Sequence, residues 1–123
     1  MLGIGVDIVS VHRMKETLEQ GGSFFLDKVF TPAEKEYCHS HPDAAICYAG
    51  RFAAKEAIFK TFATEWKEEM SFLDIEIHNG SCGEPLVLLH GRFPELLAEK
   101  GGHEVIISLS WEQDTAVAFA VMV

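Results

Sequence analysis

Asp7 is a carboxylate in the middle of an apolar segment near the N-terminus. Residues 2–9 alternate with the period of a β-strand, which places Asp7 on one face together with Gly3 and Gly5. A buried carboxylate is costly unless it is paired, hydrogen-bonded or bound to a metal ion. Taken alone, Asp7 therefore favours an exposed strand face, although the two glycines would let a ligand or another backbone approach closely.

A second carboxylate, Glu56, lies in the longest helical segment. Helical spacing places it beside Phe52, Ala53 and Phe59, along a largely apolar strip, with Lys60 one turn further on. The simplest interpretation is an exposed Glu56–Lys60 pair, which stabilises a helix by only about 0.2–0.5 kcal/mol. The alternative combines both regions, because two carboxylates and a lysine suit a hard cation that bridges to phosphate oxygens.

Other reactive side chains lack the spacing that their chemistry requires. Cys38, Cys47 and the histidines between them match no zinc pattern, so we expect a solvated loop. Ser108 lies in an alternating strand without the G-x-S-x-G context of a hydrolase nucleophile, and no glycine-rich phosphate loop follows a strand. The three cysteines have no C-x-x-C spacing, which predicts reduced thiols.

The periodicity of the sequence predicts the elements that position these residues. The first half indicates a strand over 2–9 and helices over 11–20, 31–40 and 44–64. The second half indicates a hairpin over 72–78 and 85–90, a helix over 93–100 and a hairpin over 104–111 and 115–123. This order of elements predicts an α+β fold.

Length and composition restrict the class of protein. The 123 residues fit a single domain, 1–123, and 48% hydrophobic with 24% charged residues is typical of a soluble globular protein. Nineteen acidic and ten basic residues give a net charge of −9, which argues against a nucleic-acid-binding surface. We find no signal peptide and no apolar run long enough for a membrane helix, and therefore expect a cytoplasmic protein that does not bind membranes.

Two segments resemble the paired signature of the holo-(acyl-carrier-protein) synthases, the small 4′-phosphopantetheinyl transferases. They are Gly3-Ile-Gly-Val-Asp-Ile-Val9 and Arg51-Phe-Ala-Ala-Lys-Glu-Ala-Ile-Phe-Lys60, and the similarity continues through residues 72–77, 83–85, 107–110 and 116–119. The resemblance implies the fold of that family, an antiparallel sheet packed on a long helix. It also implies a homotrimer with active sites at the subunit interfaces.

The same resemblance implies a reaction. The 4′-phosphopantetheine group of coenzyme A is transferred to a serine of an apo acyl carrier protein, and adenosine 3′,5′-bisphosphate is released. Asp7 and Glu56 would bind Mg²⁺ (or Mn²⁺) with the pyrophosphate, and Lys60 would offset the charge that develops there. Glu56 or a metal-bound water would take the serine proton.

Further residues follow from the resemblance. Arg13 occupies the basic position on the first helix that meets the acidic carrier protein. Arg51, Lys60 and Ser108 are the expected coenzyme A-binding residues, with Arg51 near the 3′-phosphate. The chain departs from the family where a glycine-rich turn, a lysine and a histidine are usual, at Ala63-Thr64-Glu65, Glu84 and Trp111.

These departures leave two alternatives. One is a non-catalytic relative that binds coenzyme A or a carrier protein without transfer. The other is a transferase dedicated to a carrier domain of a polyketide or lipid synthase. A Mg²⁺-dependent transferase for the acyl carrier protein of fatty acid synthesis is the leading prediction, because Asp7, Glu56 and Lys60 are all present.

Overall fold

The computed structural model describes residues 1–123 and is built around one long helix, α4 (Ala44–Thr61). The strands are β1 (Gly3–Ser10), β2 (Ile75–Asn79), β3 (Pro85–Leu89), β4 (Val105–Glu112) and β5 (Thr115–Met122). The shorter helices are α1 (Val11–Glu19), α2 (Ser23–Val29), α3 (Pro32–His39) and α5 (Phe93–Glu99), with a 3₁₀ turn η1 (Phe72–Asp74).

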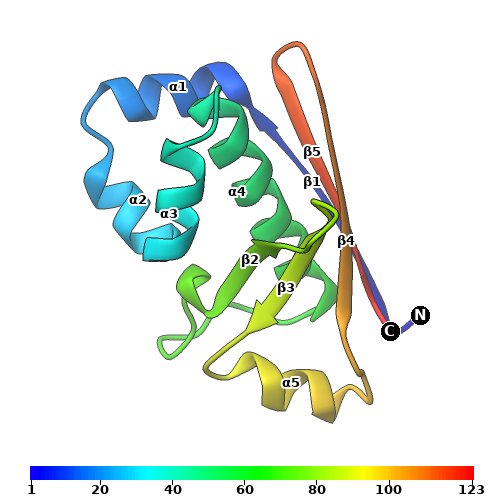
Figure 1. The fold of residues 1–123 in the computed structure, drawn as a ribbon. Helices are drawn as coiled ribbons and strands as arrows, with labels where there is room; N and C mark the ends of the chain where they lie inside the picture. Colours follow the sequence, from blue (N-terminus) through cyan, green and yellow to red (C-terminus); the bar gives the residue numbers. More distant parts are fainter.

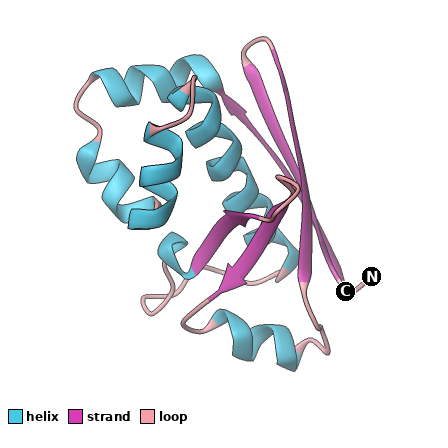
Figure 2. Ribbon diagram, viewed as in Figure 1, coloured by secondary structure: helices cyan, strands magenta, loops and turns pink.

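Two antiparallel sheets pack against α4 (Figures 1 and 2). The larger sheet has the strand order β1–β5–β4, and the smaller one consists of the hairpin β2–β3. Helices α1, α2 and α3 lie on the side of α4 away from the large sheet (Figure 1). The α+β class, both hairpins and the packing of an antiparallel sheet on the long helix are therefore confirmed. No helix combines the length and the hydropathy that crossing a bilayer requires.

Strand β1 and helix α4 approach each other at backbone distance because small residues line the contact. A Cβ atom added to Gly5 would lie 2.0 Å from the carbonyl oxygen of Ala57, and one added to Gly3 would lie 2.1 Å from that of Thr61. Only glycine leaves room for the helix at these two positions. The alanines that β5 turns toward α4 are also buried: Ala116, Ala118 and Ala120.

The buried and exposed faces of the large sheet differ from the prediction. The face that carries the glycines and Asp7 packs on α4. The prediction that this face of the strand is exposed, which rested on Asp7 alone, is therefore wrong. Ile4, Val6 and Ile8 point outward instead, because large side chains do not fit where the strand meets the helix most closely. We call the exposed apolar surface of the sheet the outer face; it is formed by Ile4, Val6, Ile8, Ile106 and Phe119.

A buried ion pair joins α4 to the segments that surround it. The Nζ atom of Lys55 donates to Oε1 of Glu34 at 2.7 Å, and to the backbone oxygens of Val29 and Phe72 at 2.7 and 2.9 Å. The other oxygen of Glu34 accepts the backbone N–H of Ile77 at 2.8 Å. Both side chains are fully buried, so these partners compensate for the lost hydration. The pair thereby fixes α4 against α2, α3, η1 and β2.

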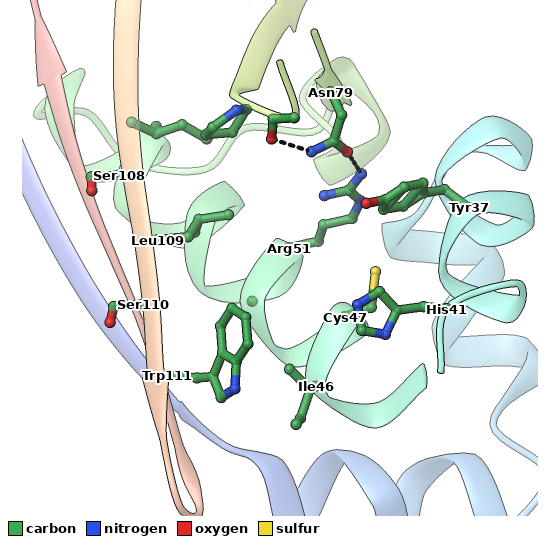
Figure 3. A pocket seen from close by; sticks show the side chains of 14 residues that line it. Tyr37, His41, Ile46, Cys47, Arg51, Asn79, Ser108, Leu109, Ser110 and Trp111 are labelled. Atoms are coloured by element: carbon green, nitrogen blue, oxygen red, sulfur yellow. Dashed lines mark hydrogen bonds between the residues drawn. The ribbon is translucent and has the colours of Figure 1, made fainter. Parts of the chain in front are cut away.

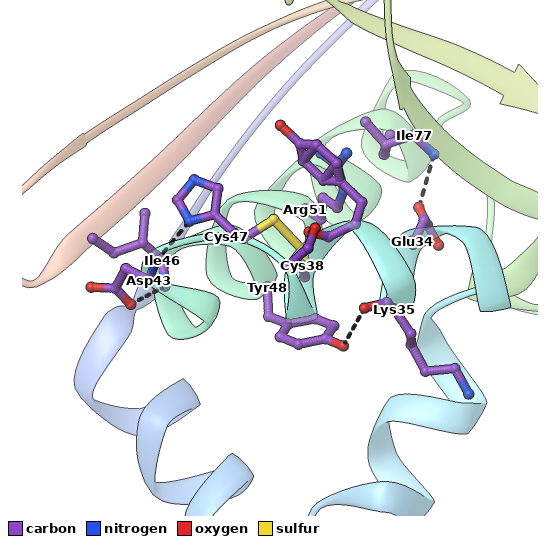
Figure 4. Close-up of a disulfide and its surroundings, with 12 residues drawn as sticks. Glu34, Lys35, Cys38, Asp43, Ile46, Cys47, Tyr48, Arg51 and Ile77 are labelled. Atoms are coloured by element: carbon purple, nitrogen blue, oxygen red, sulfur yellow. Dashed lines mark hydrogen bonds between the residues drawn. A yellow bond between two sulfur atoms is a disulfide. The ribbon is translucent and has the colours of Figure 1, made fainter.

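Two expectations from the sequence are wrong. No helix was predicted between residues 22 and 31, yet α2 occupies most of this interval and buries Leu26 and Val29. A disulfide joins Cys38 in α3 to Cys47 in α4, with Cα atoms 5.4 Å apart (Figure 4), so these two thiols are not reduced. The pairing depends on how α3 packs on α4, which the spacing of the cysteines does not reveal. Cys82 is free and exposed.

Candidate active site

Asp7, Glu56 and Lys60 lie at the contact between β1 and α4, and we call this group the acidic corner. The Nζ atom of Lys60 donates to Oδ1 of Asp7 at 3.1 Å and to the backbone oxygen of Val6 at 2.9 Å. Lys60 therefore pairs with the strand, in place of the expected i,i+4 pair with Glu56. The packing of β1 on α4 thus brings together three residues that the sequence singled out separately.

Glu56 is half-buried and makes no ion pair. Burial raises the pKa of its carboxyl group, the negative charge of Asp7 raises this pKa further, and Lys60 acts in the opposite direction. Two carboxylates thus share one ammonium group, which itself is half-exposed. The corner keeps an excess of negative charge that a bound cation would neutralise.

The donor set of the acidic corner fits Mg²⁺. This ion is usually held by one or two carboxylates and completes its octahedral shell with water and the phosphate oxygens of a substrate. The corner offers two carboxylates, and the chain contains no group of three histidine, cysteine or acidic side chains that would enclose a metal ion by itself. The corner is therefore suited to a cation shared with a phosphorylated ligand rather than to a structural metal site.

A second site, which we call the β4 pocket, has a volume of about 390 Å³ (Figure 3). It lies between β4, the N-terminal half of α4, the end of α3 and the turn that joins β2 to β3. Its size is in the range of small-molecule sites in proteins. The lining residues are Tyr37, His41, Ile46, Cys47, Gly50, Arg51, Asn79, Gly83, Pro85 and residues 107–111.

Arg51 provides the only permanent positive charge of the β4 pocket. It is only 4% exposed, it donates from Nη2 to Oδ1 of Asn79 at 2.6 Å, and its guanidinium lies 4.4 Å from the centre of the Tyr37 ring. Burial lowers the pKa of Arg51, although Glu34 and Tyr37 oppose this effect. The Nε atom is buried and has no hydrogen-bond partner. Arg51 is thus held in place at the wall of the pocket.

Ser108 contributes its backbone to the wall of the pocket, and its hydroxyl group points elsewhere. Along β4, Leu109 and Trp111 face α4, whereas Ser108 and Ser110 lie on the other side of the strand (Figure 3). This side belongs to the outer face of the sheet. Within one chain, the hydroxyl of Ser108 therefore points away from Arg51.

The positions that depart from the family pattern are rebuilt in the structure. Glu84 folds into its own turn, where its Oε1 atom accepts the backbone N–H of Cys82 at 3.1 Å. Ala63 has a φ of 51°, a left-handed conformation that glycine adopts more easily, so the turn after α4 holds an alanine in a strained conformation. Helix α4 consequently ends at Thr61, three residues before the predicted position.

Arg13 lies on the exposed surface of α1 and makes no ion pair. The helix begins at the N-cap Ser10, whose Oγ atom accepts the backbone N–H of Arg13 at 3.2 Å. The carboxylate of Asp114, in the turn between β4 and β5, accepts the backbone N–H of His12 at 2.7 Å. The start of α1 is therefore fixed against the large sheet, and the Arg13 side chain remains available to a partner.

The acidic corner and the β4 pocket lie apart within one chain. Asp7 is on β1 and the pocket is on β4, and these strands form opposite edges of the sheet. Arg51 and Glu56 are five residues apart on α4 and point in directions that differ by about 140°. A ligand that spans both sites would therefore have to pass around the helix or bridge two chains.

Several residues of the pocket were not identified from the sequence. Tyr37 and Asn79 hold Arg51, but they lie in other segments and carry no motif of their own. Ile46 and Gly50 share a helix face by their i,i+4 spacing, which is the only sequence signal that places them together. The buried pair Lys55–Glu34 was also missed, since its partners come from distant parts of the chain.

Comparison with known proteins agrees with this geometry. Residues 3–120 match the model of the 4′-phosphopantetheinyl transferase superfamily. A holo-(acyl-carrier-protein) synthase from Desulforudis audaxviator is 46% identical over 123 residues, which cover 100% of this chain and 93% of that protein.

Solved structures are similar over the same length. The holo-(acyl-carrier-protein) synthase of Neisseria meningitidis has a TM-score of 0.88 at 34% identity, with 99% of this chain and 98% of that chain covered. The enzyme of the same name from Helicobacter pylori, in complex with coenzyme A, has a TM-score of 0.81 at 29% identity, with 98% and 99% covered. The chain thus belongs to the 4′-phosphopantetheinyl transferase superfamily and, within it, to the family of holo-(acyl-carrier-protein) synthases.

Proposed function

We propose that residues 1–123 act as one domain that transfers the 4′-phosphopantetheine group of coenzyme A to a serine of an apo acyl carrier protein, releasing adenosine 3′,5′-bisphosphate. The observation that carries this proposal is the acidic corner, where two carboxylates and one ammonium group converge. Such a group suits a reaction in which negative charge moves between phosphate oxygens. The relatives from Desulforudis audaxviator and Neisseria meningitidis described above are both named holo-(acyl-carrier-protein) synthases.

Asp7 and Glu56 would hold Mg²⁺. When bound, the ion supplies positive charge next to the phosphate oxygens on which negative charge develops. Lys60 is anchored to Asp7 and to the backbone oxygen of Val6, so its ammonium group is already oriented toward the corner. It offers a further positive charge to the pyrophosphate without having to reorganise.

Glu56 is the best candidate for the general base. The serine oxygen bonds to the β-phosphorus, the bond from this phosphorus to the bridging oxygen breaks, and adenosine 3′,5′-bisphosphate leaves with that oxygen. The serine proton passes to the Glu56 carboxylate or to a water molecule beside it. Glu56 is preferred to Asp7 because the Asp7 carboxylate is already paired with the ammonium group of Lys60, whereas the Glu56 carboxylate makes no ion pair.

The β4 pocket receives the nucleotide end of coenzyme A. Arg51, the only residue with a permanent positive charge that lines the pocket, is placed to bind the 3′-phosphate. The structure of the Helicobacter pylori relative contains coenzyme A, which supports a site for this donor on the shared fold. The hydroxyl of Ser108 lies on the outer face, so we assign its contact with coenzyme A to a molecule held between neighbouring chains.

A homotrimer explains how the two separated sites act together. The outer face exposes a row of large apolar side chains; Ile8 alone is 68% exposed. Contiguous apolar surfaces of this kind mark protein contacts. We propose that three copies pack through the outer face, so that the acidic corner of one chain meets the β4 pocket of the next. The expected oligomeric state is checked by light scattering.

Arg13 on α1 is proposed to contact the acyl carrier protein. The helix is firmly placed by Ser10 and Asp114, and the Arg13 side chain is exposed without an internal partner. An acidic carrier surface would form charge pairs with it, which mainly accelerate association. Replacement of Arg13 by glutamate should therefore raise the KM for the carrier protein, with a smaller effect on the affinity for coenzyme A.

The experiment that tests the proposal is intact-mass measurement of an apo acyl carrier protein. The carrier is incubated with this protein, coenzyme A and Mg²⁺, and a parallel sample contains EDTA. A mass gain equal to one phosphopantetheine group that EDTA prevents is the expected result. Lack of a gain with several apo carriers, while the protein stays folded, would refute transfer and favour a non-catalytic relative. A gain restricted to a synthase carrier domain would favour a dedicated transferase.

A further inference from the structure

Trp111 differs from the other tryptophan of the chain in having no aromatic partner. It is 58% exposed, and its indole N–H donates to no protein acceptor. Trp66, by contrast, is stacked on Phe59 with ring centroids 3.9 Å apart and an interplanar angle of 7°. One face of the Trp111 ring is thus open to a ligand, whereas the Trp66 ring is used inside the protein.

The position of Trp111 on β4 directs this open ring into the β4 pocket. Alternation along the strand places Trp111 on the same side as Leu109, toward α4. Figure 3 shows Trp111 projecting from β4, with Ile46 across the pocket on α4. An aromatic ring and an aliphatic side chain therefore flank one end of the pocket, which leaves a site for a flat apolar group.

The remaining wall of the pocket supplies the opposite chemistry. Arg51 lines this wall with its positive charge, and Tyr37 and Asn79 fix its guanidinium group. A pocket with an open aromatic face at one end and a guanidinium at another fits a ligand that joins a heteroaromatic ring to a phosphate. Nucleotides have this composition, and the pocket volume of about 390 Å³ is large enough for one.

We propose that Trp111 is the residue on which the purine ring of the donor stacks, and that it determines the affinity of the site for the adenosine end of coenzyme A. This inference rests on the proposed function. The base is separated from the β-phosphorus by the ribose and the α-phosphate, so the stacking contact is the same before and during the transfer. Trp111 is therefore a specificity-determining residue, and its loss should change KM and leave kcat unaltered.

Binding is tested first, without the transfer reaction. A Trp66→Phe variant retains Trp111 as the sole tryptophan, so its fluorescence reports on this ring alone. We expect adenosine 3′,5′-bisphosphate to quench the fluorescence. Cytidine 3′,5′-bisphosphate, which carries the same two phosphates on a smaller ring, should bind several-fold more weakly.

Substitution of Trp111 supplies the matched controls, with affinities measured by calorimetry. Trp111→Ala should weaken the binding of adenosine 3′,5′-bisphosphate by about 5- to 150-fold, which corresponds to one base–aromatic stack. Trp111→Phe keeps a ring and should lose much less. Because the residue is exposed, neither change should affect folding.

The transfer assay separates failure of this inference from failure of the proposed function. With coenzyme A and an apo carrier, Trp111→Ala should raise the KM for coenzyme A by the factor seen in binding. Unchanged nucleotide affinity in Trp111→Ala would overturn the inference, and so would a loss confined to the KM for the carrier protein. If the unaltered protein binds the nucleotide through Trp111 but transfers nothing, the proposed function fails and this inference stands.

Discussion

The acidic corner and the β4 pocket are built in different ways, although both use side chains of α4. The corner joins two elements, β1 and α4, and its shape is set by backbone contact at Gly5. The pocket collects residues from α3, α4, the β2–β3 turn and β4, between positions 37 and 111. Local packing therefore fixes the acidic corner, whereas the β4 pocket depends on how distant segments meet.

This contrast shows where the family pattern is free to change. An added methyl group at Gly5 has no space, and a charge change at Asp7 or Glu56 removes a ligand of the corner. Trp111 and Glu84, in comparison, lie at the open edge of the molecule and are exposed. Side chains of different size and charge therefore have room at these two positions, on and beside the wall of the β4 pocket.

The strongest test of the corner removes one of its charges. Asp7→Asn and Glu56→Gln preserve size and should each lower kcat/KM by about 10²- to 10³-fold, because stabilisation of the developing charge is lost. The measurement is the initial rate of carrier modification, with circular dichroism to show that the fold is retained. Glu65→Gln is a control, since Glu65 is exposed in the loop after α4. Full activity of both variants would disprove the role of the corner.

A second test compares one added methyl group in the two regions. Gly5→Ala places a Cβ atom 2.0 Å from the Ala57 oxygen and should reduce the free energy of unfolding by about 3 kcal/mol. Gly50→Ala, in α4 beside the pocket, meets nothing within 4 Å and should stabilise the helix by about 0.5–1 kcal/mol. Urea denaturation measures both. Equal effects would contradict the difference in packing described above.

Reduction of the disulfide acts on the pocket side only. Opening the Cys38–Cys47 bond, which closes a loop with a sequence separation of 9, should lower the free energy of unfolding by about 2–3 kcal/mol. Thermal denaturation with and without dithiothreitol measures this loss. Alkylation of the unfolded protein without reductant should modify one cysteine, Cys82. Modification of three cysteines would show that the bond is not formed.

A smaller effect is expected in the turn after α4. Ala63→Gly relieves the left-handed conformation at φ 51° and should raise the free energy of unfolding by about 1 kcal/mol. The same substitution in α5, Ala98→Gly, should lower it by about 1 kcal/mol, because glycine weakens a helix. Chemical denaturation of the two variants gives the comparison. A loss of stability in both would show that the turn is not strained.

The smallest effect concerns the pH dependence of the corner. Because the pKa of Glu56 is raised in the folded state, its ionised form costs stability above the ordinary carboxyl pKa, and the cost vanishes below it. Glu56→Gln should therefore be the more stable protein at neutral pH, by about 0–1 kcal/mol, and the difference should disappear in acid. Melting temperatures across this range provide the test. Added Mg²⁺ should stabilise the unaltered protein more than the variant.

The sequence predicted the corner better than the pocket for a physical reason. Asp7 and Glu56 stand out because each is a carboxylate among apolar neighbours, and a short stretch of sequence around it is enough to show this. Tyr37 and Asn79 join the β4 pocket only through contact with Arg51, and no pattern in the sequence around them indicates this contact. The same holds for the disulfide and for α2, which are determined by tertiary packing. Glycine at 3 and 5 signalled the close approach but not its partner.

The Lys55–Glu34 pair also decides where Glu56 points. The three acceptors around the Lys55 ammonium belong to other segments. Their positions therefore fix the rotation of α4 about its own axis. Glu56 follows Lys55 and is turned from it by about 100°. The Glu56 carboxylate therefore faces β1 although it makes no hydrogen bond of its own. Its direction is set by the contacts of Lys55 on another side of the helix. If apolar residues replaced both Lys55 and Glu34, the fold could stay stable, but the hydrogen bonds that orient Glu56 toward β1 would be lost.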